Sequence, residues 1–435
     1  MREGGACMSV KKKTVFKSFD YMHCDDFARF LSEMAAKGWH FKEWGLGLKF
    51  EQGEPEQVVY AVEVFTDASE YDLRPEANTT LNFAEYCREA GWELVDAKRK
   101  FCIFKRVQED AVPILTQEER VENTYKERNR ELIPGFVISA MMLTMQVLDL
   151  SSKYLFPARI FSPFTLSLLI LWATGFIERC VKLIGLWMWK RKMKQKLAAG
   201  ETIYLGNDSG KLQILSKSGF WISIIIELMC IAMIPEKWLW QLVVFFIGLL
   251  LSILVLSMIL AKVRPESNTN FIIQTAFSMF YIVTILIVAV CFGELERQDR
   301  IQAEAPLMKE DYVEFRGEVE SITLYDDRNI LGRSQKYLIS YEDREDGLSS
   351  SLHYFKYSSE VEWIMDRIWQ LETDMWSGDE WEECTQEWEA NIAFYDGNKT
   401  YCVRYDDIIL IFDDYDERVL AQEQIDIIRD KLDLR

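Results

Sequence analysis

The sequence predicts a multidomain membrane protein: an N-terminal α+β ferredoxin-like domain, an α-helical transmembrane bundle of about five spans and a C-terminal α+β domain. Three observations predict this class. Five apolar segments lie between residues 133 and 292, strand-like and helix-like apolar patterns precede and follow them, and the acidic charge is concentrated after residue 294. We expect domains over 9–107 and 308–435, a linker over 108–132 and the membrane region over 133–292.

The first hundred residues contain a diverged repeat of a helix, a glycine and a tryptophan. Gly38 and Trp39 follow one apolar helix face, and Gly91 and Trp92 follow a second at matched spacing. Each glycine stands where a helix C-cap needs a left-handed residue, and each tryptophan opens a strand. We interpret both tryptophans as core anchors, with a ligand groove as the alternative.

Alternating apolar residues around the repeat predict strands. Residues 46–50 and 58–64 alternate on either side of Gly53, which predicts a β-hairpin. With strands at 15–19 and 101–104, the order is βαββαβ with one extra strand. That order is typical of a ferredoxin-like sandwich, with two helices on one face of a sheet.

Several stretches in this region carry a family resemblance. They are Phe19, the helix 27–36, AKGWH at 36–40, FEQGEP at 50–55 and AGWE at 90–93. Together they closely resemble the bacterial family called domain of unknown function 2812, over roughly the first quarter of the chain. The resemblance implies a bacterial membrane protein whose genes often neighbour PadR-like transcription regulators. It implies no catalytic or binding residues.

Five spans are expected in the central region because each segment is apolar and two are long enough to cross a bilayer. The expected spans are residues 133–150, 161–177, 220–234, 238–261 and 271–292. Basic residues flank one side of these spans 12 times and the other side 5 times. The positive-inside rule then predicts a multi-pass protein of the cell membrane with a cytoplasmic N-terminus, and an odd span number places the C-terminus outside.

One carboxylate lies within an expected span. Glu227 is flanked by isoleucines and leucine, where an isolated charge is costly and usually faces a partner or a cavity. Arg179 and Lys182 are candidate partners, and Glu178 could pair with them instead. Helix packing and a transport or sensing role are both open for Glu227.

The C-terminal region is strongly acidic and predicts an independent α+β domain. Residues 294–435 carry a net charge of −21 against −19 for the whole chain, which disfavours nucleic acid as a partner. Apolar spacing predicts a helix over 361–369, strands over 392–395, 401–405 and 408–412, and a terminal helix over 425–432. Cys384 and Cys402 form a candidate disulfide, with two free thiols as the alternative.

No catalytic motif, cofactor signature or metal-ligand set is found in the sequence. The leading hypothesis is a non-enzymatic regulator or sensor that links an outer domain to a cytoplasmic protein-binding domain. The alternative is a transporter or export accessory protein that uses Glu227. Expected partners are the lipid bilayer and a protein, and the sequence predicts no particular small-molecule ligand.

Overall fold

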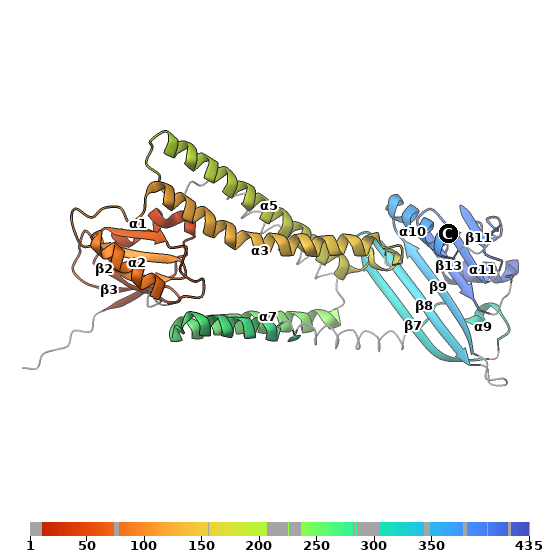
Figure 1. Cartoon of the computed structure of the whole chain (residues 1–435). Coiled ribbons are helices and arrows are strands. Elements are labelled where there is room, and N and C mark those ends of the chain that lie inside the picture. The colour runs from red at the N-terminus through yellow and green to blue at the C-terminus, as the bar shows by residue number, and fades with distance from the viewer. Residues whose placement is uncertain are drawn as a thin grey trace, which may run out of the picture. The chain divides into compact units, whose positions relative to one another are not determined.

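The computed structural model describes residues 11–73, 78–154, 156–206, 225, 236–281, 283–284, 304–315, 317–342, 349–376, 381–397, 399–415 and 419–434 (Figure 1). Its contacts divide the chain into two units. The first comprises Met1–Ala140, Thr174–Ile222 and Trp240–Ile282, and the second comprises Met141–Ala173, Ser223–Leu239 and Val283–Arg435. Each unit has its own apolar core.

The N-terminal domain is a duplicated β-α-β-β unit. The first copy contains β1 (Lys12–Val15), α1 (Cys24–Ala36), β2 (Trp39–Trp44) and β3 (Leu48–Gln52), with a short 3-10 helix (Tyr21–His23) before α1. The second contains β4 (Tyr60–Val64), α2 (Asn78–Glu89), β5 (Trp92–Lys98) and β6 (Phe101–Arg106). Each copy forms an antiparallel three-stranded sheet, in the orders β1-β3-β2 and β4-β6-β5. The two copies therefore share one topology.

This arrangement corrects the ferredoxin-like prediction. The described strands form two three-stranded sheets, whereas a ferredoxin-like fold has one four-stranded sheet. The expected hairpin between residues 46–50 and 58–64 is also wrong, because β3 pairs with β1 and β2 while β4 pairs with β6. The hairpin turns lie instead at Gly45–Gly47 and at Arg99, whose φ is 55°. Alternation identifies a strand but does not identify its partner.

Helix α1 packs its apolar face on strands of both sheets. Cys24, Phe27 and Leu31 recur on that face and are completely buried against β4 and β2. The sheets meet where β2 lies against β5, and there the Trp44 backbone N–H donates to Asp96 Oδ2. Helix α2 covers β5 over a second apolar cluster. The domain core is thus shared by both copies of the repeat.

The central region contains α3 (Gln117–Ser151), α4 (Phe156–Arg159), α5 (Pro163–Ala198) and α7 (Glu236–Val263). Among the described residues, only α3 and α5 are long and apolar enough to cross a membrane, so the prediction of about five spans is wrong. The expected span at 220–234 falls almost entirely outside the described residues, and the one at 271–292 does so in part. In α7 the apolar window found is the shorter Ile247–Val263.

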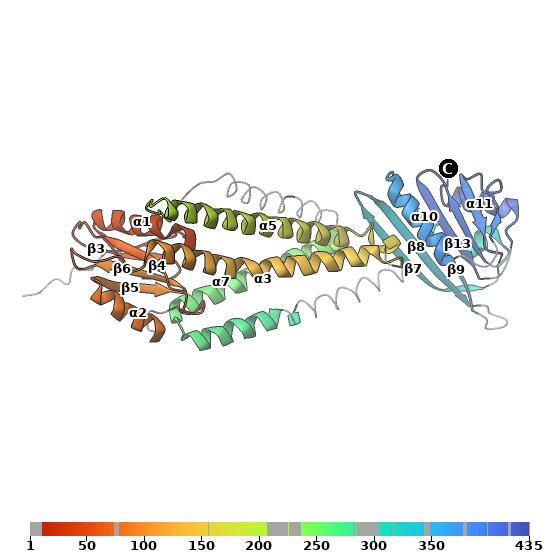
Figure 2. The ribbon, with the colours of Figure 1, turned by 45° about the horizontal axis from the view of Figure 1, so that its top comes forward.

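The C-terminal domain is a seven-stranded antiparallel sheet with helices on both faces (Figure 2). Its elements are α9 (Lys309–Tyr312), β7 (Glu318–Asn329), β8 (Gly332–Glu342), β9 (Ser349–Ser358), α10 (Glu362–Trp376), β10 (Glu382–Glu383), β11 (Ile392–Tyr395), β12 (Thr400–Arg404), β13 (Ile408–Asp414) and α11 (Gln422–Lys431). The strand order is β10-β11-β12-β13-β9-β8-β7. Helix α10 covers the face whose cluster includes Cys402 and Ile409, while α9 and α11 cover the opposite face.

Candidate functional site

Helix α3 begins inside the N-terminal domain, where Arg120 binds two carboxylates. Its Nε donates to Glu63 Oε2 at 3.0 Å, and its Nη2 donates to Asp25 Oδ1 at 2.6 Å. Glu63 lies on β4, and Asp25 lies in the first turn of α1. The planar guanidinium presents several donors in a fixed geometry, which suits two carboxylates at once. Arg120 therefore ties α3 to both α1 and β4.

Burial sets the protonation of this cluster. It raises the pKa of Glu63 to about 7, although the neighbouring Arg120 pulls that pKa downward. Burial also disfavours the charge on Arg120, but Glu63 and Asp25 outweigh it and hold the Arg120 pKa above its ordinary value. Glu63 therefore takes up a proton near neutral pH, because its burial outweighs its ion pair with Arg120.

The chain that follows α5 contacts the same cluster, which consists of Asp25, Glu63 and Arg120. The Leu205 N–H donates to Asp25 Oδ2 at 2.6 Å, and the Asp25 N–H donates to the Leu205 carbonyl at 2.8 Å. Beside them, the Tyr204 hydroxyl donates to Asp26 Oδ1 at 2.7 Å. Asp25 therefore contacts the beginning of α3 and the segment after α5 together.

From Val121 onward, the buried face of α3 is part of the domain core. Val121, Thr124 and Glu127 are each no more than 1% exposed. The Glu127 carboxylate lies 3.4 Å from Lys100 Nζ, and that ammonium donates to the Thr66 carbonyl at 2.6 Å. Residues 117–132, expected as part of a linker, are therefore a packed helix of the N-terminal domain.

The chain after α3 enters the core of the C-terminal domain. Phe156, Ile160 and Phe161 are buried in the cluster under α10, and Leu150 packs against it. Asn329 at the end of β7 donates from Nδ2 to the Ile160 carbonyl at 2.9 Å. The connection between α3 and α5 is therefore a structural part of the second unit.

Glu178, Arg179 and Lys182, which were considered together with Glu227, all lie on α5. Glu178 forms an i,i+4 ion pair with Lys182 on α5. Arg179 packs on α3, where a Cβ added at Gly135 would lie 2.9 Å from its Cζ. Glu227 lies outside the described residues. The structure therefore brings Glu178 and Lys182 together, which is the alternative pairing considered for them.

The repeated glycines and tryptophans lie at helix ends and in the core. Gly38 and Gly91 have φ of 77° and 86°, the left-handed conformation that a helix C-cap requires. Trp92 is buried, and its Nε1 donates to the Val112 carbonyl at 2.7 Å. Trp39 is partly buried against the cluster that contains α1.

Cys384 and Cys402 are both free thiols. Cys402 on β12 is buried in the cluster under α10, whereas Cys384 packs against the cluster on the other face of the sheet. The candidate disulfide is therefore absent because the sheet separates the two side chains.

One acidic residue of the C-terminal domain, Asp414, is paired with a buried lysine. Lys309 is completely buried, and its Nζ lies 2.8 Å from Asp414 Oδ1. The Tyr312 hydroxyl donates to Asp414 Oδ2 at 2.9 Å. Over the described ranges, no group of three or more His, Cys, Asp or Glu side chains is arranged to hold a metal ion.

Sequence reasoning missed the beginning of α3, although a signal for it is present. Thr116 and Glu119 form a capping box, in which the Glu119 N–H donates to Thr116 Oγ1 at 3.3 Å and the Thr116 N–H donates to Glu119 Oε2 at 2.8 Å. This spacing of Thr and Glu marks a helix start. The partners of Arg120 carry no such signal because they come from distant parts of the chain.

Comparison with known proteins identifies one family. Residues 24–137 match the family model described as protein of unknown function (DUF2812), which confirms the resemblance expected for the N-terminal region. The matched range contains α1, both sheets except β1, and α3 as far as its apolar half. No curated protein and no solved structure matches the chain.

Proposed function

We propose that this chain is a multi-pass membrane protein that acts as a non-enzymatic regulator or sensor, coupling an outer C-terminal domain to a cytoplasmic N-terminal domain. The observation that carries the proposal is the course of α3. Its first turns belong to the N-terminal core, and its last turn leads into residues of the C-terminal core. α3 is one helix over Gln117–Ser151, in which Pro134 lacks a backbone N–H and removes one bond of the hydrogen-bond ladder. We infer that a shift at one end of this helix is carried to the other.

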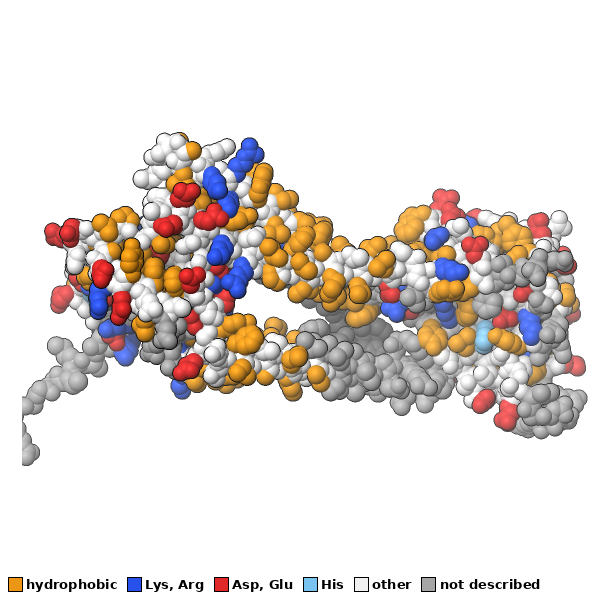
Figure 3. All heavy atoms as spheres, in the orientation of Figure 1, with side chains coloured by type: hydrophobic (Ala, Val, Ile, Leu, Met, Phe, Trp, Pro, Cys, Tyr) orange, Lys and Arg blue, Asp and Glu red, His pale blue; other side chains and the backbone are white. Residues whose placement is uncertain are grey.

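The surfaces of α3 and α5 support membrane insertion. Only 11% of the apolar window of each helix is buried, whereas the core helix of a soluble protein is mostly buried. Val137, Met145, Leu148, Phe164 and Ile177 are each more than half exposed. Figure 3 shows apolar side chains over both helices. Lipid tails would remove this surface from water.

Charge and contacts support the sidedness. Basic residues gather before the apolar half of α3 and at the end of α5, which is the pattern expected on the cytoplasmic side. They are Lys126, Arg128, Arg130, Lys190, Arg191, Lys192, Lys194 and Lys196. The connection at 152–162 is then outside, and it packs in the C-terminal core.

Sidedness is tested with single cysteines at exposed positions of the full-length protein in its own membrane. Glu89 on α2 and Glu423 on α11 are both exposed. A membrane-impermeant maleimide should label Glu423→Cys in intact cells, and should label Glu89→Cys only after the cells are disrupted. Labelling by the unsubstituted protein is subtracted. Labelling of Glu89→Cys in intact cells would reject the proposed sidedness.

Coupling is tested by disturbing one domain and observing the other. Phe161 is completely buried in the C-terminal core, whereas Phe164 is 63% exposed. We expect Phe161→Ala to raise hydrogen exchange over residues 117–132, and Phe164→Ala to leave it unchanged. Hydrogen exchange followed by mass spectrometry of the lipid-embedded protein measures both. Unchanged exchange in Phe161→Ala, with faster exchange confined to the C-terminal domain, would reject coupling.

A second variant locates the path of the coupling. Met141 and Met142 lie in the apolar half of α3, and replacing both by glycine costs helix stability by about 1 kcal/mol per residue. The Phe161→Ala effect on residues 117–132 should then shrink. If it persists in full, coupling does not travel along α3.

A further inference from the structure

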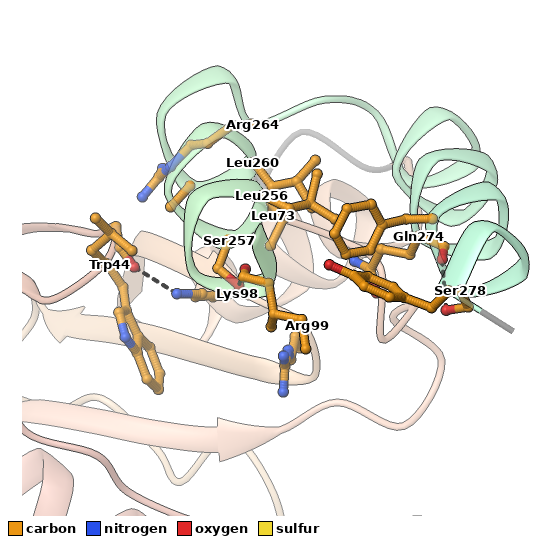
Figure 4. A pocket seen from close by; sticks show the side chains of 16 residues that line it. Trp44, Leu73, Lys98, Arg99, Leu256, Ser257, Leu260, Arg264, Gln274 and Ser278 are labelled. Atoms are coloured by element: carbon orange, nitrogen blue, oxygen red, sulfur yellow. Dashed lines mark hydrogen bonds between the residues drawn. The ribbon is translucent and has the colours of Figure 1, made fainter. Parts of the chain in front are cut away.

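A pocket lies within the first unit, between the N-terminal domain and two apolar helical segments. Its volume is about 430 Å³. The turn after β2 and the end of β5 form one wall, and α7 together with the helical residues 267–281 forms the other (Figure 4). The N-terminal domain contributes Lys98 and Arg99 together with the apolar Trp44, Leu46 and Leu73, and the helical segments form the opposite side.

Three cations line this pocket, and no carboxylate among the described residues does. They are Lys98, Arg99 and Arg264. The charge of Arg264 is partly neutralised by two carboxylates outside the pocket. Its Nη1 lies 3.8 Å from Glu43 Oε2 and 3.8 Å from Asp96 Oδ1. Arg99 is exposed at the turn between β5 and β6. The lining therefore has an excess of positive charge.

The pKa of Lys98 is affected by this excess of positive charge. Its Nζ donates to the Gly45 carbonyl at 2.6 Å, so a neutral oxygen is its hydrogen-bond acceptor. Burial, and after it the charges of Arg99 and Arg264, lower the pKa of Lys98 to about 8, although Asp96 acts in the opposite direction. An anion in the pocket would oppose both effects.

The opposite wall is apolar with a few hydroxyl and amide groups. Leu256, Leu260 and Phe277 supply apolar surface, while the Ser278 hydroxyl donates to the Gln274 carbonyl and Gln274 Nε2 donates to Asn270 Oδ1. On the face of α7 that lines the pocket, Ile253 is part of the lining, and Leu250, one turn before it, is exposed. A ligand that fits both walls has an anionic head and an apolar tail.

We propose that this pocket binds the phosphate-bearing headgroup of an anionic phospholipid. Lys98 and Arg99 hold the phosphate, and Leu256 and Leu260 contact the first part of an acyl chain. Free phosphate shares the anionic chemistry but leaves the apolar wall without a contact. The proposal rests on the membrane location given above, because a bilayer supplies this ligand at high local concentration.

The test uses the purified full-length protein in a neutral detergent. Native mass spectrometry is recorded with phosphatidylglycerol, with phosphatidylcholine and with inorganic phosphate. We expect selective retention of phosphatidylglycerol. Arg99→Gln and Lys98→Gln should each weaken it about fivefold, which corresponds to about 1 kcal/mol per cation. Arg106→Gln is the matched control, because Arg106 is an exposed cation on β6 that does not line the pocket.

The outcomes separate the alternatives. Equal loss in Arg106→Gln would show a general surface effect and would overturn the site. Binding of inorganic phosphate that displaces phosphatidylglycerol would show that the anion alone is recognised, which overturns the lipid assignment. Equal retention of phosphatidylcholine and phosphatidylglycerol would overturn it as well. Arg99 is exposed, so we expect Arg99→Gln to fold. This variant alone can decide the test if Lys98→Gln fails to fold. Cysteine labelling tests the sidedness independently, so the two proposals can fail separately.

Discussion

Lys100 and Glu127 form an ion pair inside the N-terminal domain, with 3.4 Å between Lys100 Nζ and Glu127 Oε2 and side-chain exposures of 2% and 0%. Lys100 lies in the turn between β5 and β6, and Glu127 lies on α3. Removing two charges from water is costly, and their mutual attraction offsets that cost only while both are present. The pair therefore makes α3 dependent on the sheet beneath it.

The first prediction follows from this dependence. Glu127→Leu leaves the Lys100 ammonium buried without its carboxylate, and we expect a loss of about 3–5 kcal/mol. Lys100→Met combined with Glu127→Leu removes both charges and should recover most of that loss. Thermal unfolding of the full-length protein in detergent compares both variants with the unsubstituted protein. A double variant as unstable as Glu127→Leu would contradict the prediction.

The second prediction concerns pH and Glu63. Its folded-state pKa is about 7 against an ordinary value of 4.5, so the folded chain binds this proton more tightly than the unfolded chain. The resulting stability is fully present below the ordinary value and is lost as the pH rises through about 7. We expect the melting temperature to fall over that window because of Glu63.

The control for this pH effect is a substitution that cannot ionise. Glu63→Gln should flatten the pH dependence over the same window, whereas Glu93→Gln, at an exposed position on β5, should leave it as in the unsubstituted protein. Melting temperatures are compared across the pH range. An unchanged slope in Glu63→Gln would show that another group titrates.

The third prediction concerns the two cysteines of the C-terminal domain. Burial raises the pKa of the Cys384 thiol to about 12 and that of Cys402 well above its ordinary value, so neither forms a reactive thiolate near neutral pH. We expect both to remain thiols under mild oxidation of the folded protein. Alkylation after denaturation, followed by peptide mass spectrometry, should find both modified. A peptide linked through Cys384 and Cys402 would contradict the arrangement across the sheet.

Local elements were predictable where one short pattern determines them. The i, i+3, i+4 spacing of Val361, Ile364 and Met365 indicates the helix observed as α10, and the Asp396-Gly397 turn indicates the pairing of β11 with β12. The Gly38 and Gly91 caps belong to the same class, since only a residue tolerant of positive φ suits that position.

Pairing between distant segments was not predictable. The strands β3 and β4 are neighbours in sequence but lie in different sheets, and nothing in their alternation distinguishes these arrangements. The cluster of Arg120 with Asp25 and Glu63 likewise joins residues as much as 95 positions apart. Run length did not identify the spans either. The shorter runs at 133–150 and 161–177 lie in α3 and α5, whereas the longer run at 238–261 lies in α7, where the apolar window found is Ile247–Val263.

The last prediction uses three glycines that follow helices. Gly38, Gly91 and Gly200 have φ of 77°, 86° and 73°, so alanine at each position adopts an unfavourable conformation costing about 1–2 kcal/mol. They differ in what an added Cβ meets. At Gly200 nothing lies within 4 Å, at Gly91 the Cβ would lie 2.8 Å from the Ala111 Cβ, and at Gly38 it would lie 2.7 Å from the Gly53 carbonyl oxygen.

The order of the three costs therefore tests the close packing at the repeat. Gly200→Ala should show the conformational cost alone. Gly91→Ala should cost more, and Gly38→Ala should cost most. The Gly53 N–H donates to the Gly38 carbonyl at 2.9 Å, so the Gly53 backbone cannot move as easily as the loop carrying Ala111. Overpacking of this kind adds about 1–3 kcal/mol. Melting temperatures of the full-length protein measure the series. Equal losses of stability in Gly38→Ala and Gly200→Ala would show that the backbone at Gly53 moves away from the added Cβ with no loss of stability.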